Sequence, residues 1–241
     1  MPDYPAADRL ALVDDLHGRS VPDPYRWLED SADPRSTAWR SAQDGLIAAE
    51  RAGWSTRETF AERIDQLMGA GSVSPPYYRG DWCFTTRRDP GQQFPVLYVR
   101  GADGVDRVLF DPIAVDPTGV TTLDSWQPSK EGDRVALQYS IGGNEESILA
   151  VIDTATGERI EDGIDRCRYS PIAWLPGGDR FYYVRRIAPE LLPETEQKFH
   201  RRVYLHTVGT ETDTDVLVFG AGMTMTNYYG VEVSRDGRWL Q

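Results

Sequence analysis

Cysteine is scarce in this chain of 241 residues. Only Cys83 and Cys167 are present, 84 residues apart, and neither belongs to a Cys-x-x-Cys or Cys/His spacing. Disulfide frameworks and zinc sites need several such residues at short, regular spacings, so the sequence suggests neither. We expect no metal and no cofactor, and a reducing, cytoplasmic setting.

Positive charge and long apolar runs are also in short supply. The chain has 26 Lys and Arg against 38 Asp and Glu, a formal net charge of -12 at pH 7, with no basic cluster. A surface of this sign repels phosphate groups, which argues against nucleic acid and anionic membranes as partners. No apolar run approaches the length of a membrane span, and residues 1–5 lack the basic and apolar regions of a signal peptide. We therefore expect a protein that is neither secreted nor membrane-spanning.

The motif of a catalytic serine is missing as well. In many hydrolases the nucleophile lies in Gly-x-Ser-x-Gly, a sharp turn between a strand and a helix, and no serine here has both glycines. The histidines His17, His200 and His206 have no such serine to activate, so we interpret them as structural or surface residues. The sequence predicts no catalytic residue in this chain.

A repeated pattern of turns and strands fills the chain from Ser72 onward. Aromatic residues make up 11% of the chain, and short runs of Val, Tyr and Leu alternate with Gly and Pro, which favours strands. Four glycines lie in polar turns just before a strand-like run, at intervals of 52, 46 and 59 residues: Gly80, Gly132, Gly178 and Gly237. Repeats of about 40 to 50 residues built from short strands are typical of β-propeller blades.

We therefore predict a mainly β fold, an incomplete β-propeller of about three blades plus the start of a fourth over residues 72–241. The fourth copy stops in mid-blade at Gln241. An ordinary β-sandwich whose hairpins look alike is the alternative. The open strand edge of an incomplete propeller predicts aggregation or partial disorder of the isolated chain.

Residues 1–71 form a different segment, an extended arm followed by two helices. The arm covers about the first 30 residues and is punctuated by prolines. Asp33-Pro34 predicts the start of a helix that runs to about Ala52, with Asp as N-cap and Pro in the first turn. A second helix carries an apolar stripe and ends at Gly69 and Gly71; the stripe consists of Phe60, Ile64, Leu67 and Met68. Packing onto a neighbouring domain is the expected role of these amphipathic helices, and a groove for a cofactor or partner is the alternative.

One decapeptide of the arm is unusually rich in rings, prolines and charges: Val21-Pro22-Asp23-Pro24-Tyr25-Arg26-Trp27-Leu28-Glu29-Asp30. Its prolines predict a stiff, extended backbone at the start of the decapeptide. We interpret four acidic residues near Arg26 as ion-pairing groups that face another domain rather than as metal ligands: Asp23, Glu29, Asp30 and Asp33. The decapeptide resembles the N-terminal hallmark of the prolyl oligopeptidase family of serine peptidases. The turns and strands that follow resemble the propeller of that family, so the resemblance covers essentially the whole chain.

The resemblance implies an enzyme of which this chain is the front part. Residues 1–71 would belong with a C-terminal α/β-hydrolase domain that carries the catalytic triad, and that domain is absent from this sequence. The whole enzyme would cleave short proline-containing peptides on the C-terminal side of proline, with the propeller as a size filter, whereas the 241-residue chain alone would be inactive. Sister enzymes prefer basic residues, so the substrate preference stays open. A non-catalytic propeller module that binds a peptide or protein partner is the alternative function.

Two substrate-binding residues are implied by the same resemblance. The stretch around Tyr169 resembles the one that carries an aromatic pocket residue, and the stretch around Tyr228 resembles the one that carries an apolar pocket residue. Phenylalanine or methionine is commoner at both positions in the family. The alternative is that both tyrosines belong to the propeller core.

Overall fold

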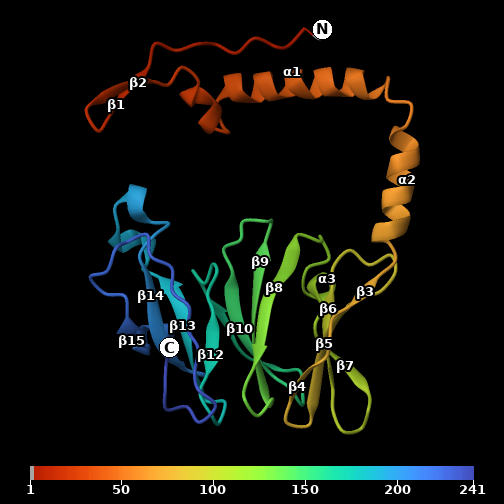
Figure 1. The fold of residues 1–241 in the computed structure, drawn as a ribbon, viewed down its shortest axis with the longest axis vertical. Helices are drawn as coiled ribbons and strands as arrows, with labels where there is room; N and C mark the ends of the chain where they lie inside the picture. The colour runs from red at the N-terminus through yellow and green to blue at the C-terminus, as the bar shows by residue number, and fades with distance from the viewer. Residues whose placement is uncertain (1–2) are drawn as a thin grey trace. The chain divides into compact units, whose positions relative to one another are not determined.

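The computed structural model describes residues 3–241, which fall into two compact units. The first unit ends at Met68, and the second is Gly69–Gln241 (Figure 1). The first unit consists of a hairpin, a single 3-10 turn and two helices: β1 (Val13–Leu16), β2 (Arg19–Pro22), η1 (Arg26–Glu29), α1 (Pro34–Arg51) and α2 (Arg57–Met68).

The arm is not extended throughout, because strands β1 and β2 pair in an antiparallel hairpin. His17 and Gly18 form its two-residue turn with φ of 56° and 76°, the left-handed conformation that such tight hairpins require. The Asp15 carboxylate accepts a hydrogen bond from the Gly18 amide at 2.8 Å. The sequence prediction of a simple extended arm is therefore wrong for these residues, although Val21 and Pro22 are extended as expected.

Trp27 anchors the decapeptide to the start of α1. Its side chain is only 5% exposed, and its indole Nε1 donates a hydrogen bond to the Asp8 carbonyl at 2.8 Å. Its own carbonyl accepts a hydrogen bond from Ser36 Oγ at 2.6 Å. Asp33 caps α1 through the Arg35 amide at 2.8 Å, which confirms the predicted helix start.

The charged residues of the arm pair within their own unit. Arg26 forms ion pairs with Asp14 and Asp23, and Arg35 forms one with Asp33. For Asp23 and Asp33, the expectation that they pair with another domain is therefore wrong. The hairpin explains the difference, because it brings Asp14 of β1 next to Arg26.

The second unit contains three antiparallel sheets that follow one another in chain order (Figure 1). The first sheet holds β3 (Ser72–Val73), β4 (Tyr77–Arg79), β5 (Trp82–Arg88), β6 (Val96–Arg100) and β7 (Asp106–Phe110), and the short helix α3 (Pro112–Val115) follows it. The second holds β8 (Thr121–Pro128), β9 (Arg134–Ile141), β10 (Ile148–Asp153) and β11 (Arg159–Ile164). The third holds β12 (Ile172–Trp174), β13 (Arg180–Arg186), β14 (Arg201–Thr207) and β15 (Val216–Phe219). Three 3-10 turns complete this unit: η2 (Pro189–Leu191), η3 (Glu194–Glu196) and η4 (Thr212–Thr214).

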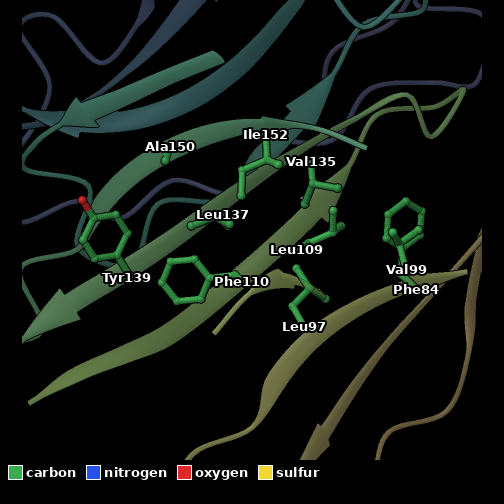
Figure 2. Packing of buried hydrophobic residues seen from close by; sticks show 10 residues of the cluster. All are labelled: Phe84, Leu97, Val99, Leu109, Phe110, Val135, Leu137, Tyr139, Ala150 and Ile152. Atoms are coloured by element: carbon green, nitrogen blue, oxygen red, sulfur yellow. The ribbon is translucent and has the colours of Figure 1, made fainter. Parts of the chain in front are cut away.

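Side chains point alternately to the two faces of each strand, and this alternation builds one buried layer between neighbouring sheets. In β9, Val135 and Leu137 point to the first sheet, while Ala136 between them points to the third. Figure 2 shows the first layer, in which Phe84 and Leu97 of the first sheet meet side chains of the second. Burial on both faces explains why neither β9 nor β10 shows a strict alternation of apolar and polar residues.

The layer between the second and third sheets is built around aromatic rings. The rings of Trp174 and Phe181 lie edge to face with centroids 4.8 Å apart, a favoured aromatic geometry. Leu149 and Ile164 pack against them from the second sheet. Sheets that bury their faces only against neighbours in sequence are propeller blades, so the predicted propeller is confirmed and a two-layer sandwich is excluded.

The repeated glycine turns contact one another from blade to blade. A Cβ atom at Gly132 would lie 2.5 Å from the Arg79 carbonyl oxygen, and one at Gly80 would lie 2.5 Å from the Glu131 carbonyl oxygen. The Gly177 amide in the third turn donates a hydrogen bond to the Glu131 carboxylate at 3.0 Å. The repeat visible in the sequence therefore marks the points where adjacent blades touch.

A fourth blade begins after the third. Val233 and Leu240 form an antiparallel bridge, and Lys130, in the turn between β8 and β9, donates to the carbonyls of Val233 and Ser234 at 3.1 and 2.6 Å. The sheets of the described chain do not close into a ring. Three blades and the start of a fourth are thus present, as the repeat predicts. None of the helices within residues 3–241 is long and apolar enough to cross a bilayer.

Candidate functional site

A hollow of about 530 Å³ lies in the second unit, between the second and third blades and the segment that leads into the fourth. Tyr169 and Tyr229 supply its aromatic wall, and Asp124, Gln138 and Glu145 supply polar groups. The hollow thus combines rings with a few placed polar atoms, the usual composition of a ligand site.

The turn that carries Tyr169 is held in an uncommon backbone conformation. Arg166 and Tyr169 have φ of 60° and 56°, values that cost side-chain-bearing residues energy. The Gln138 amide donates to the Ser170 carbonyl at 2.6 Å, and the Val184 amide donates to Ser170 Oγ at 2.8 Å. Buried hydrogen bonds from two blades therefore fix the turn that presents the Tyr169 ring.

The Tyr169 hydroxyl is tied to the neighbouring loop between β9 and β10. It donates a hydrogen bond to Glu145 Oε2 at 2.8 Å, and Arg168 pairs with the same oxygen. These two hydrogen bonds lower the pKa of Glu145, so this carboxyl stays ionised and is not a proton donor near neutral pH. Glu145 itself has φ of 57°. The ring of Tyr169 is oriented by its hydroxyl and remains 58% exposed.

Asp124 at the base of the hollow is already engaged. Its two carboxylate oxygens accept hydrogen bonds from Ser140 Oγ at 2.9 Å and Ser147 Oγ at 2.7 Å. Thr122 Oγ1 donates a further bond at 3.1 Å. Asp124 therefore holds strands and a loop together rather than serving as a free base.

Tyr228 does not line this hollow. Its ring lies over the Arg201 guanidinium, 3.7 Å from the ring centroid, and is 64% exposed. The next residue, Tyr229, lines the hollow instead, and its ring meets Phe219 edge to face at 5.6 Å. Two adjacent tyrosines made the pocket position ambiguous in the sequence, and the strand pattern after them gave no signal to choose between them. With more than half of each ring exposed, Tyr169 and Tyr228 are not core residues, so that alternative is wrong.

Two histidines are engaged with carboxylates, and the third belongs to the first unit. His206 is fully buried on β14, with Nδ1 2.6 Å from Asp215 Oδ1 and Nε2 2.9 Å from Glu161 Oε2. His200 Nε2 lies 2.7 Å from Glu196 Oε2, and His17 lies in the turn of the first unit. Across residues 3–241, no three or more His, Cys, Asp or Glu side chains gather in a way that could hold a metal ion. Among the described residues, the hollow therefore has no metal site beside it.

Comparison with known proteins supplies the family. Residues 4–241 match the family model described as the N-terminal β-propeller domain of prolyl oligopeptidase. This chain belongs to the prolyl oligopeptidase family. The family assignment predicted from the decapeptide and the glycine turns is confirmed.

Members of the prolyl oligopeptidase family with curated names and solved structures support this assignment. The chain is 28% identical over 240 residues to the prolyl endopeptidase of Elizabethkingia meningoseptica, covering 98% of this chain and 34% of that protein. A solved structure from a study of two prolyl endopeptidases has a TM-score of 0.88 and 32% identity, covering 99% of this chain and 36% of that one. Prolyl oligopeptidase B of Galerina marginata, solved with a 35mer hydrolysis and macrocyclization substrate, has a TM-score of 0.83 and 25% identity, with coverage of 99% and 36%.

The chain spans about a third of the length of these relatives. The matched third is their N-terminal propeller portion.

Proposed function

We propose that this chain is the substrate-selecting part of a serine endopeptidase that cleaves short peptides on the C-terminal side of proline. The relatives that it matches over nearly its whole length are prolyl endopeptidases, which supports this activity. The observation that carries the proposal is the aromatic hollow between Tyr169 and Tyr229. Flat rings with a fixed orientation suit a proline ring, which loses little entropy when it packs on them.

In this proposal, Tyr169 and Tyr229 form the walls of a pocket near the proline of the substrate. Tyr228 contributes from the rim, because its exposed ring is next in sequence to the wall. The propeller acts as a size filter that admits short peptides and excludes folded proteins. The two free thiols, Cys83 and Cys167, are consistent with the reducing, cytoplasmic setting that we propose for the enzyme.

The catalytic triad is proposed to lie in an α/β-hydrolase domain on which residues 1–71 pack. The apolar stripe of α2 supports this, because Phe60, Ile64, Leu67 and Met68 are each more than half exposed in the first unit. Apolar patches of this kind on helices mark contact surfaces. The 241-residue chain alone is then expected to be inactive.

The activity is tested by reading the gene beyond codon 241 and purifying its complete product beside the 241-residue chain. We expect the complete product to carry a Gly-x-Ser-x-Gly turn and to hydrolyse a proline reporter peptide, with a serine-directed phosphonate abolishing the reaction. The chain alone should give no hydrolysis. Phosphonate-sensitive hydrolysis by the chain alone would overturn the proposal that the catalytic triad lies in a separate domain. A gene that ends at this codon would leave peptide binding as the only proposed function.

The pocket is tested by titrating the chain with a proline-containing peptide and following tryptophan fluorescence. Tyr169→Ala removes one wall, and loss of one aromatic contact of about 1 kcal/mol predicts roughly fivefold weaker binding. Tyr78→Ala is the matched control, because Tyr78 is also an exposed tyrosine of the second unit but lies on β4, outside the hollow. Equal weakening by both substitutions would argue against the pocket.

A further inference from the structure

Two arginines face each other at one end of the third blade. Arg186 ends β13 and Arg201 begins β14, and the register places them directly opposite each other. Both are buried, with Arg201 only 5% exposed. Like charges directly opposite on paired strands are destabilising, and burial increases the cost. Such an arrangement needs a compensating negative charge.

The carboxylates nearby compensate all but one of the positive charges. Arg186 pairs with Glu146, and Arg168 pairs with Glu145. Arg201 has no ion pair with any carboxylate of the part of the chain that the structure describes. Its Nε and Nη1 atoms are buried without a hydrogen-bond partner among these residues. Burial, together with the nearby charge of Arg186, lowers the pKa of Arg201.

Tyr228 covers this guanidinium, which has no ion pair among the described residues. The Arg201 guanidinium carbon lies over the Tyr228 ring, 3.7 Å from its centroid, and Tyr228 is 64% exposed. Tyr228 belongs to residues 220–232, a segment without a regular strand that few backbone hydrogen bonds hold in place. One of these bonds runs from the His200 amide to the Met225 carbonyl at 2.9 Å. A rotation of the Tyr228 side chain would therefore open the guanidinium to a ligand. Tyr229, which follows Tyr228 in the chain, already lines the aromatic hollow.

We propose that Arg201 receives a carboxylate of the bound peptide. The inference rests on the proposed peptide binding and adds a charge preference to it. A guanidinium binds a carboxylate through two parallel hydrogen bonds, and such a pair would satisfy one of the two nitrogens that now lack partners. One carboxylate balances the single uncompensated charge, whereas a doubly charged phosphate would be repelled by Glu145 and Glu146.

The test compares two proline-containing peptides that differ only in one residue, glutamate in the first and glutamine in the second. We expect the 241-residue chain to bind the acidic peptide about tenfold more tightly at low salt. Arg201→Gln should remove this preference. Arg180→Gln is the matched control, because Arg180 lies at the opposite end of β13 and makes no contact with this cluster.

Folding is checked by circular dichroism, and Arg201→Lys is used if the glutamine variant does not fold. Lysine keeps the charge but loses the two-pronged geometry, so the preference should fall severalfold without disappearing. Equal affinity of the unaltered chain for both peptides overturns the inference and leaves the proposed function standing. If neither peptide binds, the proposed pocket fails together with the inference.

A second experiment distinguishes a carboxylate of the bound peptide from a carboxylate of the complete protein itself. The same peptides are used as competitors of hydrolysis by the complete enzyme. A retained preference assigns Arg201 to the peptide. A preference that is present in the 241-residue chain but lost in the complete enzyme assigns Arg201 to a carboxylate of the protein itself, which would overturn the peptide as its ligand.

Discussion

Replacing His206 by glutamine should make the stability of the propeller less dependent on pH. The imidazole links two blades, since Glu161 lies on β11 of the second and Asp215 directly precedes β15 of the third. The Tyr183 hydroxyl donates to the other Asp215 oxygen at 2.6 Å, so the carboxylate is fixed in place. Burial alone would lower the pKa of His206, but the hydrogen bonds and charges of the two carboxylates outweigh it and raise the pKa to about 9.

The sign and size of the effect follow from this shift. A histidine whose pKa is higher in the folded state stabilises the fold fully below its ordinary value of 6.5, and this stabilisation is lost as the pH rises through about 9. The difference corresponds to about 3 kcal/mol, and solvent screening at the partly exposed Glu161 reduces it to about 2 kcal/mol. At pH 6 the free energy of unfolding of the unaltered chain should therefore be higher than that of His206→Gln by at least about 2 kcal/mol. This difference between the two proteins should shrink by about 2 kcal/mol at pH 9.

Urea unfolding between pH 6 and 9, followed by tryptophan fluorescence, measures this difference. Urea is preferred because it does not screen ion pairs. Tyr183→Phe serves as the control, because it removes the neighbouring hydrogen bond to Asp215 without removing a group that titrates in this range; burial raises the pKa of Tyr183. Its cost, about 1 kcal/mol, should be the same at every pH. A His206→Gln deficit that is equal at pH 6 and pH 9 would refute the proposed ion-pair link between the blades.

The remaining predictions concern the glycine turns and the thiols. Gly132→Ala should lower the free energy of unfolding by well over 2 kcal/mol, because the new methyl group would collide with the Arg79 carbonyl, whereas Gly104→Ala should cost only about 1 kcal/mol. Both positions have positive φ, but a methyl group at Gly104 would meet nothing within 4 Å, so equal losses in urea unfolding would contradict the close approach. Burial raises the pKa of the Cys167 thiol to about 12, so iodoacetamide at pH 8 should modify the half-buried Cys83 and spare Cys167 until urea is added. Peptide mass spectrometry measures the extent of labelling at each cysteine. Labelling of Cys167 in the folded chain at the rate of Cys83 would contradict its burial.

Sequence reasoning identified the propeller because its signals are local and repeated. Gly80 and Gly132 appear in the sequence as turn residues, and each lies shortly before a run of strand-forming residues. The N-terminal hairpin was missed because its turn uses His17 and Gly18, a pair that is not among the common tight-turn dipeptides. That miss also hid the partner of Arg26, since pairing with Asp14 exists only when the hairpin forms.

The candidate site was less accessible to sequence reasoning. Tyr169 was singled out through the stretch of sequence around it and does line the hollow, although its role in substrate binding stays a prediction. The same reasoning placed the second tyrosine one residue from the wall of the hollow. The unpaired charge of Arg201 has no sequence signal at all. It depends on which carboxylates the neighbouring loops bring close, and Glu145 and Glu146 lie more than fifty residues away along the chain.

The contacts between successive glycine turns bear on how propellers of this family change during evolution. The turns of the first and second blades touch through backbone atoms, as Gly132 does with Arg79, so this contact depends little on side-chain identity. A duplicated or deleted repeat would therefore bring a ready-made junction with it. Blade number could change by whole repeats while insertions of any length accumulate between the turns, as the unequal intervals of 52, 46 and 59 residues already illustrate.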